Sequence, residues 1–216
     1  MKNLISNNCV GARLYYVTHS EFNNPFCWAG IDIDSFIILC EHYDELDFTN
    51  IDIKLEHCNR PWQNGKANPY VILDNTLNVH FRHYLQNDDI DDPIITTVNV
   101  ESNDIVSYCR RKWISRYRRG MHMEPAFFYT LNYAQHSDHA SRMEYADKFK
   151  KLISCSPQHK LYILCHKSMH DVCMQDIDEN ENNKLITVIW MPDEEFVTGN
   201  DIQLGKNINK YIDLLN

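Results

Sequence analysis

The chain has 216 residues, of which 44% are hydrophobic and 24% are charged. These proportions are ordinary for a folded globular protein and exclude disorder as its main state. Thirty acidic residues against 21 basic ones give a formal net charge of −9, which argues against a surface that coats nucleic acid or an anionic membrane.

The first half of the chain predicts short strands, turns and three helices. Strands are expected at residues 2–6, 51–55, 70–73 and 77–81, with the last two forming a hairpin around Asp74 and Asn75. Helices are expected at residues 10–17, 34–43 and 103–117. None of the apolar runs approaches the roughly 18 residues that a membrane-spanning helix needs, so no membrane span is expected.

The second half alternates more regularly between strands and helices. Strands are expected at 126–131, 161–165 and 185–190, helices at 139–153 and 206–215, and an acidic surface loop at 176–182. This alternation predicts one α/β domain over residues 1–216. Its sheet is expected to be mixed or mostly parallel, with helices on both faces in a three-layer arrangement.

The eight cysteines are scattered along a chain that is too long to need disulfide staples. The first residues have no apolar signal-peptide region, so we expect reduced thiols and a cytoplasmic location. The sequence leaves the oligomeric state open.

One cysteine stands where the first predicted strand ends and a helix is expected to begin. Helix N-terminal amides favour a thiolate, so Cys9 is a candidate nucleophile. Amides near Val10 and Gly11 can hold an oxyanion, and Gly11 lets a substrate approach the backbone. Asn8 is expected to contact the substrate. The alternative is that Cys9 is a small buried thiol at the end of a strand.

A cysteine nucleophile needs a base, and two histidines occur near the end of the predicted hairpin. Strand alternation places His80 on one face and Phe81 with His83 on the other. If Phe81 faces the core, His83 is the partly buried histidine and the better general base. Either histidine can instead be a structural residue.

Six of the ten residues 110–119 are basic, in a chain that is otherwise acidic. Helical spacing brings Trp113, Arg116 and Tyr117 together, with Arg119 one turn beyond Arg116. Arginine forks suit phosphate and carboxylate groups, so Trp113, Arg116 and Arg119 are candidate residues for binding an anionic sugar or phosphosugar. RNA is a weaker candidate because no stacking platform accompanies these residues. The alternative is a solvated helix face.

The sequence predicts neither a metal nor a cofactor. His166 and His170 have a spacing that can bind zinc on a helix, but they match no strong zinc signature. Asp32 and Asp34 spell the Asp-x-Asp pattern of metal-dependent sugar transferases, which is very weak as a bare tripeptide. P-loop, GxGxxG, GxSxG and HExxH motifs do not occur.

Several short motifs together resemble a bacterial family of unknown function whose members are often labelled exopolysaccharide biosynthesis proteins. The motifs are Ile5-Ser6-Asn7-Asn8-Cys9, Asn24-Pro25-Phe26, Pro69, Leu73-Asp74, residues 79–84, and Trp113, Arg116 and Arg119 at Trp-x-x-Arg-x-x-Arg spacing. Residues 24–28 are also similar to the Pro-Phe-Asp-Trp element of a family of proposed papain-like cysteine peptidases, with Cys27 in place of the acid. Val10 stands where a tryptophan often follows the cysteine.

The resemblance implies a compact α/β fold, an association with surface polysaccharides, and a Cys–His centre. That centre falls on Cys9 and His83, with His80 as second choice. We therefore expect a cysteine-dependent acyltransferase or hydrolase that acts on an anionic sugar, a phosphosugar or an acyl donor. One alternative is a nucleotide-sugar-dependent glycosyltransferase of the same pathway, in which Arg111, Arg116 and Arg119 hold a nucleotide diphosphate and a carboxylate such as Asp34 is the base or a metal ligand. The other is a non-catalytic glycan-binding module.

Overall fold

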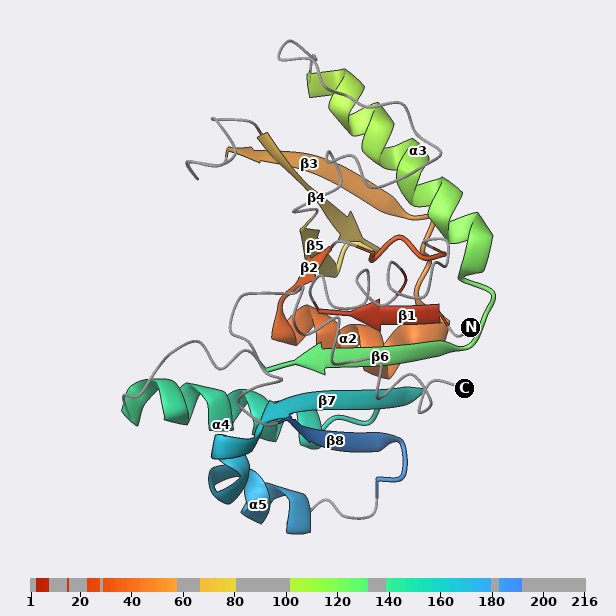
Figure 1. Cartoon of the computed structure of the whole chain (residues 1–216). Coiled ribbons are helices and arrows are strands. Elements are labelled where there is room, and N and C mark those ends of the chain that lie inside the picture. The colour runs from red at the N-terminus through yellow and green to blue at the C-terminus, as the bar shows by residue number, and fades with distance from the viewer. Residues whose placement is uncertain are drawn as a thin grey trace.

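The computed structural model describes residues 3–7, 15, 23–27, 29–57, 67–80, 102–131, 139–179 and 183–191, which form two sheets and their helices (Figure 1). The parallel sheet has the order β1 (Asn3–Ser6), β6 (Pro125–Thr130), β7 (Lys160–His166), β8 (Ile186–Met191). The antiparallel sheet has the order β2 (Gly30–Ile31), β5 (Leu77–His80), β4 (Ala67–Leu73), β3 (Ile51–His57). The helices are α2 (Ile33–His42), α3 (Ser102–Gly120), α4 (His139–Ile153) and α5 (His170–Glu179), with short 3-10 turns η1 (Tyr43–Glu45) and η3 (Lys167–Met169).

The parallel sheet is buried on both faces, as the continuous apolar runs of its strands require. In β7, Ile163 lies on one face and Leu164 on the other, and neither side chain is exposed to solvent. Phe36 of α2, Phe149 of α4 and Cys173 of α5 belong to the same core cluster as Ile163. Phe36 of α2 packs edge-on against Phe127 and Tyr129 of β6, with ring centroids 6.1 and 5.0 Å apart. This layered burial confirms the predicted α/β fold.

The antiparallel sheet is built around the predicted hairpin. Asp74 and Asn75 both have positive φ angles, 49° and 59°, which asparagine and aspartate tolerate better than most residues. Along β5, Leu77 and Val79 are buried while Asn78 is exposed, the alternation expected of a strand with one face on the core. The sequence therefore predicted this hairpin correctly, and β4 begins a few residues earlier than expected.

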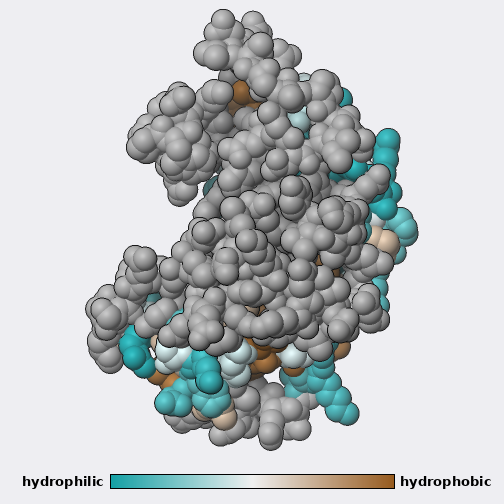
Figure 2. Space-filling model, in the orientation of Figure 1, coloured by the Kyte–Doolittle hydropathy of each residue, from teal (hydrophilic) through white to brown (hydrophobic). Residues whose placement is uncertain are grey.

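Helix α3 lies against β3 on the outer side of the antiparallel sheet (Figure 1). The Arg110 guanidinium donates to the Ile51 carbonyl oxygen at 3.2 Å. Hydrophilic side chains are visible along the side of the molecule that α3 occupies (Figure 2). The inner side of α3 therefore carries Trp113 together with the buried cations Lys112 and Arg116, whereas Arg111 and Arg118 are exposed.

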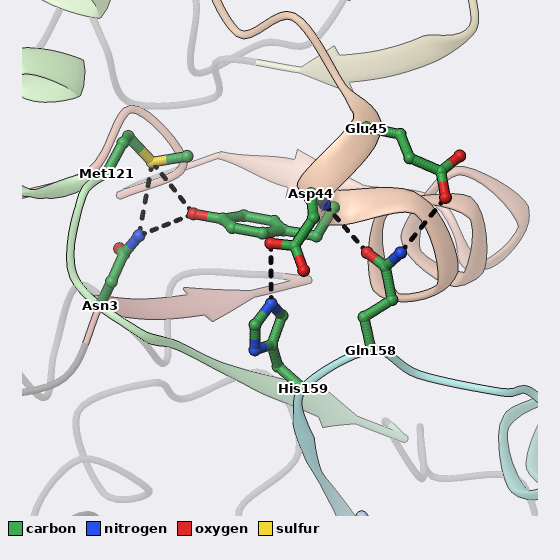
Figure 3. Close-up of polar contacts among 7 residues, drawn as sticks. Asn3, Asp44, Glu45, Met121, Gln158 and His159 are labelled. Carbon is green, nitrogen blue, oxygen red and sulfur yellow. Dashed lines mark hydrogen bonds and ion pairs between the residues drawn. The ribbon is translucent and has the colours of Figure 1, made fainter.

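A polar network ties η1 to the amino ends of the parallel strands (Figure 3). The Asn3 amide donates to the Tyr43 hydroxyl at 3.1 Å and to the Met121 sulfur at 3.4 Å. His159, just before β7, lies 3.0 Å from an Asp44 carboxylate oxygen. These contacts lie at the edge of the parallel sheet opposite to the strand ends that precede Cys9.

The structure corrects three expectations. The acidic segment 176–182 was expected to be a loop, but α5 continues to Glu179. Val172 and Cys173 pack against the core and hold this helix in place, whereas the acidic composition of the segment had suggested a loop. Strand β2 was not expected, because a two-residue strand has no periodicity to detect. The strands were expected in one sheet and form two.

The helices expected at 10–17, apart from Tyr15, and at 206–215 lie outside the described residues.

None of the described helices combines the length and the hydropathy needed to cross a bilayer.

Candidate functional site

The two sheets meet at the carboxyl end of β1, and Asn7 makes the connection. The Asn7 side chain accepts a hydrogen bond from the Thr130 amide at 2.9 Å and donates one to the Thr130 carbonyl oxygen at 3.3 Å. Its backbone carbonyl oxygen accepts a bond from the Ile31 amide of β2 at 2.9 Å. Asn7 therefore extends the ladder with β6 by its side chain and starts the contact with β2 by its backbone.

Strand β2 carries this connection on to the hairpin. Gly30 is paired with His80 and Ile31 with Val79, so β5 lies along the edge of β2 that does not face Asn7. Neighbouring strands are spaced by about 4.8 Å, so the backbones of Asn7 and His80 lie on the order of 10 Å apart across β2. Asn7 and His80 therefore lie on opposite edges of the same short strand, β2.

His80 lies on the side of β5 that faces away from the core. Its half-buried ring stacks on Tyr70, its register partner in β4, with centroids 5.6 Å apart and an interplanar angle of 27°. Val79, the residue before His80, points to the other side of the strand and is fully buried. In β5 the odd-numbered residues Leu77 and Val79 therefore face the core. The predicted alternation puts Phe81 and His83 on this same side, and both lie outside the described residues.

Four of the predicted site residues lie outside the described residues: Asn8, Cys9, Gly11 and His83. Their roles stay predictions. Asn7 and His80 are the described residues nearest to them in sequence.

Sequence reasoning missed Thr130, the last residue of β6 and the partner of Asn7. Its side chain is 2% exposed, and its hydroxyl oxygen has no hydrogen-bond partner among the described residues. A buried hydroxyl without a partner costs about 1–3 kcal/mol. The available signal was that Thr130 is a polar residue at the end of an otherwise apolar strand. In parallel sheets, ligands bind at the edge formed by the carboxyl ends of the strands.

Trp113 and Arg116 lie in the interior, on the inner side of α3. The Trp113 indole N–H donates to the Phe48 carbonyl oxygen at 2.8 Å. The Arg116 guanidinium donates to the Cys27 carbonyl oxygen at 2.8 Å and is 1% exposed. These contacts give both residues a role in holding neighbouring segments onto α3. Their predicted role in substrate binding stays a prediction.

The motif Asn24-Pro25-Phe26 is a turn that packs against the same part of α3. The Asn24 side chain accepts a bond from the Phe26 amide at 3.0 Å and donates one to the Leu4 carbonyl oxygen at 2.8 Å. The Phe26 ring packs edge-on against Trp113, with centroids 5.4 Å apart. Two motifs that carry the family resemblance, far apart in sequence, are therefore one packed unit.

A cavity of about 650 Å³ lies along the outer face of α3. Arg110, Arg111, Arg118 and Arg119 are among the residues that line it. Arg119 is thus placed apart from Trp113 and Arg116, with which the sequence analysis had grouped it. We call this cavity the arginine groove.

All six cysteines of the described ranges are buried, and none of them forms a disulfide with another. Burial raises the pKa of Cys109 and of Cys155 to about 12, and burial also raises the pKa of Cys40 and Cys165. These thiols are therefore neutral at physiological pH and poor nucleophiles. Cys9 and Cys58 lie outside the described residues.

The weaker metal candidates have structural partners in the described chain. His166 accepts a bond from the Ser168 amide as the cap of η3, and the His170 ring packs edge-on against Trp190. Asp32 caps α2 by accepting from the Ser35 amide at 2.9 Å. Over the described ranges, no group of three His, Cys, Asp or Glu side chains is placed to hold a metal ion.

Residues 2–93 match the family model described as Domain of unknown function (DUF1919). The match covers less than half of the chain and includes β1, the Asn24-Pro25-Phe26 turn, the β4–β5 hairpin, and the sequence positions of Cys9 and His83. This part of the chain is therefore similar to an uncharacterised family, as the sequence motifs predicted. A search of the curated proteins found no match.

Proposed function

We propose that the protein is a cysteine-dependent acyltransferase or hydrolase, with Cys9 as nucleophile and His83 as general base and acid. The observation that carries the proposal is the junction at Asn7. It brings Asn7, two residues before Cys9, next to β2, and β2 pairs with β5 at His80, three residues before His83. The setting in surface-polysaccharide biosynthesis rests on the sequence resemblance alone.

The length of chain on either side of the junction is compatible with this pairing. Two residues of extended chain reach at most about 7 Å and three reach at most about 11 Å. The separation between Asn7 and His80, on the order of 10 Å, is within that combined reach. The chain lengths from Asn7 to Cys9 and from His80 to His83 are therefore sufficient for a thiol–imidazole hydrogen bond between Cys9 and His83.

The proposed reaction is acyl transfer. The Cys9 sulfur attacks the acyl carbonyl carbon while His83 accepts the thiol proton, and the bond to the leaving group then breaks as His83 returns that proton to it. A sugar hydroxyl or water attacks the resulting thioester, again with His83 accepting the proton, and the thiol is regenerated. Amides near Val10 and Gly11 would stabilise the oxyanion of both steps.

Acylation by p-nitrophenyl acetate tests the nucleophile. We expect a burst of p-nitrophenolate and an acetyl group on Cys9, located by peptide mass spectrometry. Cys9→Ala should abolish the burst, whereas Cys58→Ala, the matched control, should keep it. His83→Ala should slow acylation by about 10²-fold or more, and His80→Ala by much less. An unchanged burst in Cys9→Ala, or an adduct on another cysteine, would remove the proposal.

The buried hydroxyl of Thr130 gives a second, independent prediction. Thr130→Val keeps the shape of the side chain and removes a buried hydroxyl that has no hydrogen-bond partner among the described residues, so stability should stay the same or rise by up to about 1 kcal/mol. If the hydroxyl binds the substrate, the variant should turn over p-nitrophenyl acetate more slowly, and Thr130→Ser should retain the rate. Thermal unfolding and steady-state kinetics measure the two effects. Lower stability with an unchanged rate would assign Thr130 a structural role.

The glycosyltransferase alternative has less support. Asp34, the carboxylate proposed as its base, is exposed and forms an ion pair with Lys151 of α4 at 2.8 Å. An increase in melting temperature with nucleotide-sugars, together with no acylation of Cys9, would favour that alternative.

A further inference from the structure

We propose that the arginine groove binds a small soluble ligand that carries two phosphoryl groups. The groove contains a short sequence repeat, because residues 107–111 and 115–119 both read Ser-x-x-Arg-Arg. The serine and both arginines of each copy line the same cavity, and Ile114 lies between the copies. This inference does not rest on the proposed Cys9 chemistry.

The spacing of the two copies sets the spacing of the phosphoryl groups. Corresponding residues are eight positions apart on one continuous helix. A rise of 1.5 Å per residue separates them by about 12 Å along the helix axis. Eight residues also turn the second copy by about 80° around the axis, so both copies stay on the outer side of α3. One ligand molecule can therefore contact both.

The donors of each copy fit a phosphoryl group. Each copy lines the groove with two guanidinium groups and a serine hydroxyl, which together carry more than enough donors for the three terminal oxygens of a phosphoryl group. A carboxylate has only two oxygens and would leave part of each set unused. Arg110 is held toward the sheet by its bond to the Ile51 carbonyl oxygen, which reduces the conformational entropy lost on binding.

The charges around the groove favour a small anion over a polymer. Arg111 and Arg118 are exposed, and within the described ranges neither forms an ion pair with a carboxylate. The described lining contains no aromatic side chain on which a nucleobase could stack. The net charge of −9 also opposes a long polyanion that extends beyond the groove.

The groove can be altered without disturbing the packing of α3. Trp113 and Arg116 hold the inner side of the helix, whereas Arg111 and Arg118 are exposed on the outer side. Replacement of either exposed arginine by alanine should therefore leave the melting temperature nearly unchanged. Alanine also favours the helix, which supports the same expectation.

Calorimetric titration with a series of linear alkanediol bisphosphates tests the proposal. Affinity should rise with linker length to a maximum where the phosphates span about 12 Å, and should fall beyond it. The best bisphosphate should bind about 10²-fold more tightly than inorganic phosphate. Arg111→Ala and Arg118→Ala should each reduce that affinity to the phosphate level, and Lys148→Ala on α4 should not.

Three results would overturn the proposal: an affinity that does not depend on linker length, full affinity in both arginine variants, or tighter binding of a single-stranded oligonucleotide than of the best bisphosphate. Cys9→Ala should bind the bisphosphates normally. Failure of the acylation experiment would therefore leave this proposal standing, and failure of the titration would leave the proposed Cys9 chemistry standing.

Discussion

At the scale of single residues, Asn7 shows how one amide can organise a junction. Its side chain presents both an acceptor and a donor to the Thr130 backbone, so it acts as one more residue of the parallel ladder. Its own carbonyl oxygen is then available to Ile31 of the other sheet. An aspartate has the same shape but cannot donate, so the two functions of the side chain can be separated by mutation.

Asn7→Asp should destabilise the protein by about 1–3 kcal/mol at neutral pH, because a carboxylate oxygen would then face the Thr130 carbonyl oxygen. Urea unfolding measures the loss. Asn78→Asp, at an exposed position of β5, is the control and should change stability by less than about 0.5 kcal/mol. Equal effects at the two positions would mean that the junction does not depend on the Asn7 amide.

At the scale of elements, α3 is the longest described helix and has two separate roles. Its inner side holds Phe26, Phe48 and the Cys27 carbonyl, while its outer side forms the arginine groove. Its last residue, Gly120, lies against the segment before the Asn24 turn. A β-carbon at this position would clash with the Asn23 carbonyl oxygen and with the Asn23 side chain. The close approach of two backbones therefore requires glycine where α3 ends.

Gly120→Ala should cost about 1–3 kcal/mol, because the added methyl group forces the 23–27 segment away from α3. Chemical denaturation should show the loss, and Ser115→Ala on the exposed side of the same helix should not show it. Because alanine is the better helix former, a stabilised Gly120→Ala variant would contradict the close approach of the backbones.

At the scale of the whole molecule, the core contains several tyrosines and cysteines that burial keeps neutral. Burial raises the pKa of Tyr129, Cys109 and Cys155 to about 12, against ordinary values of about 10 for tyrosine and about 8.5 for cysteine. In the unfolded chain these groups lose their protons at the ordinary values, whereas in the folded protein they keep them. Their contribution to stability is therefore fully present at neutral pH.

The melting temperature should consequently fall between about pH 9 and about pH 12, as the unfolded chain releases protons that the folded protein retains. Thermal unfolding followed by circular dichroism across this range measures the fall. Tyrosine absorbance should show part of the phenols ionising only as the protein unfolds. A melting temperature that is constant up to pH 11 would show that these groups are accessible in the folded state.

Much of the secondary structure could be predicted, because hydrophobic periodicity is a local property of the chain. Helix α4 has the predicted bounds, and the hairpin turn falls on the predicted Asp74 and Asn75. The candidate site was predicted less completely. The only signal for Thr130 was a polar residue at the end of an apolar strand, and it was missed. Of the three residues in the Trp-x-x-Arg-x-x-Arg motif, Trp113 and Arg116 are buried and Arg119 lines the arginine groove.

The sequence by itself determined the α/β class, the strands of both sheets other than β2, and the presence of helix α3, since each depends on the pattern of residues within one segment. Only the tertiary structure decided which strands share a sheet, that β2 joins β1 to β5, and which arginines of α3 point inward. These outcomes depend on hydrogen bonds between residues tens of positions apart, such as Arg116 with Cys27 and Asn7 with Thr130. Such partners become available only when the chain has folded.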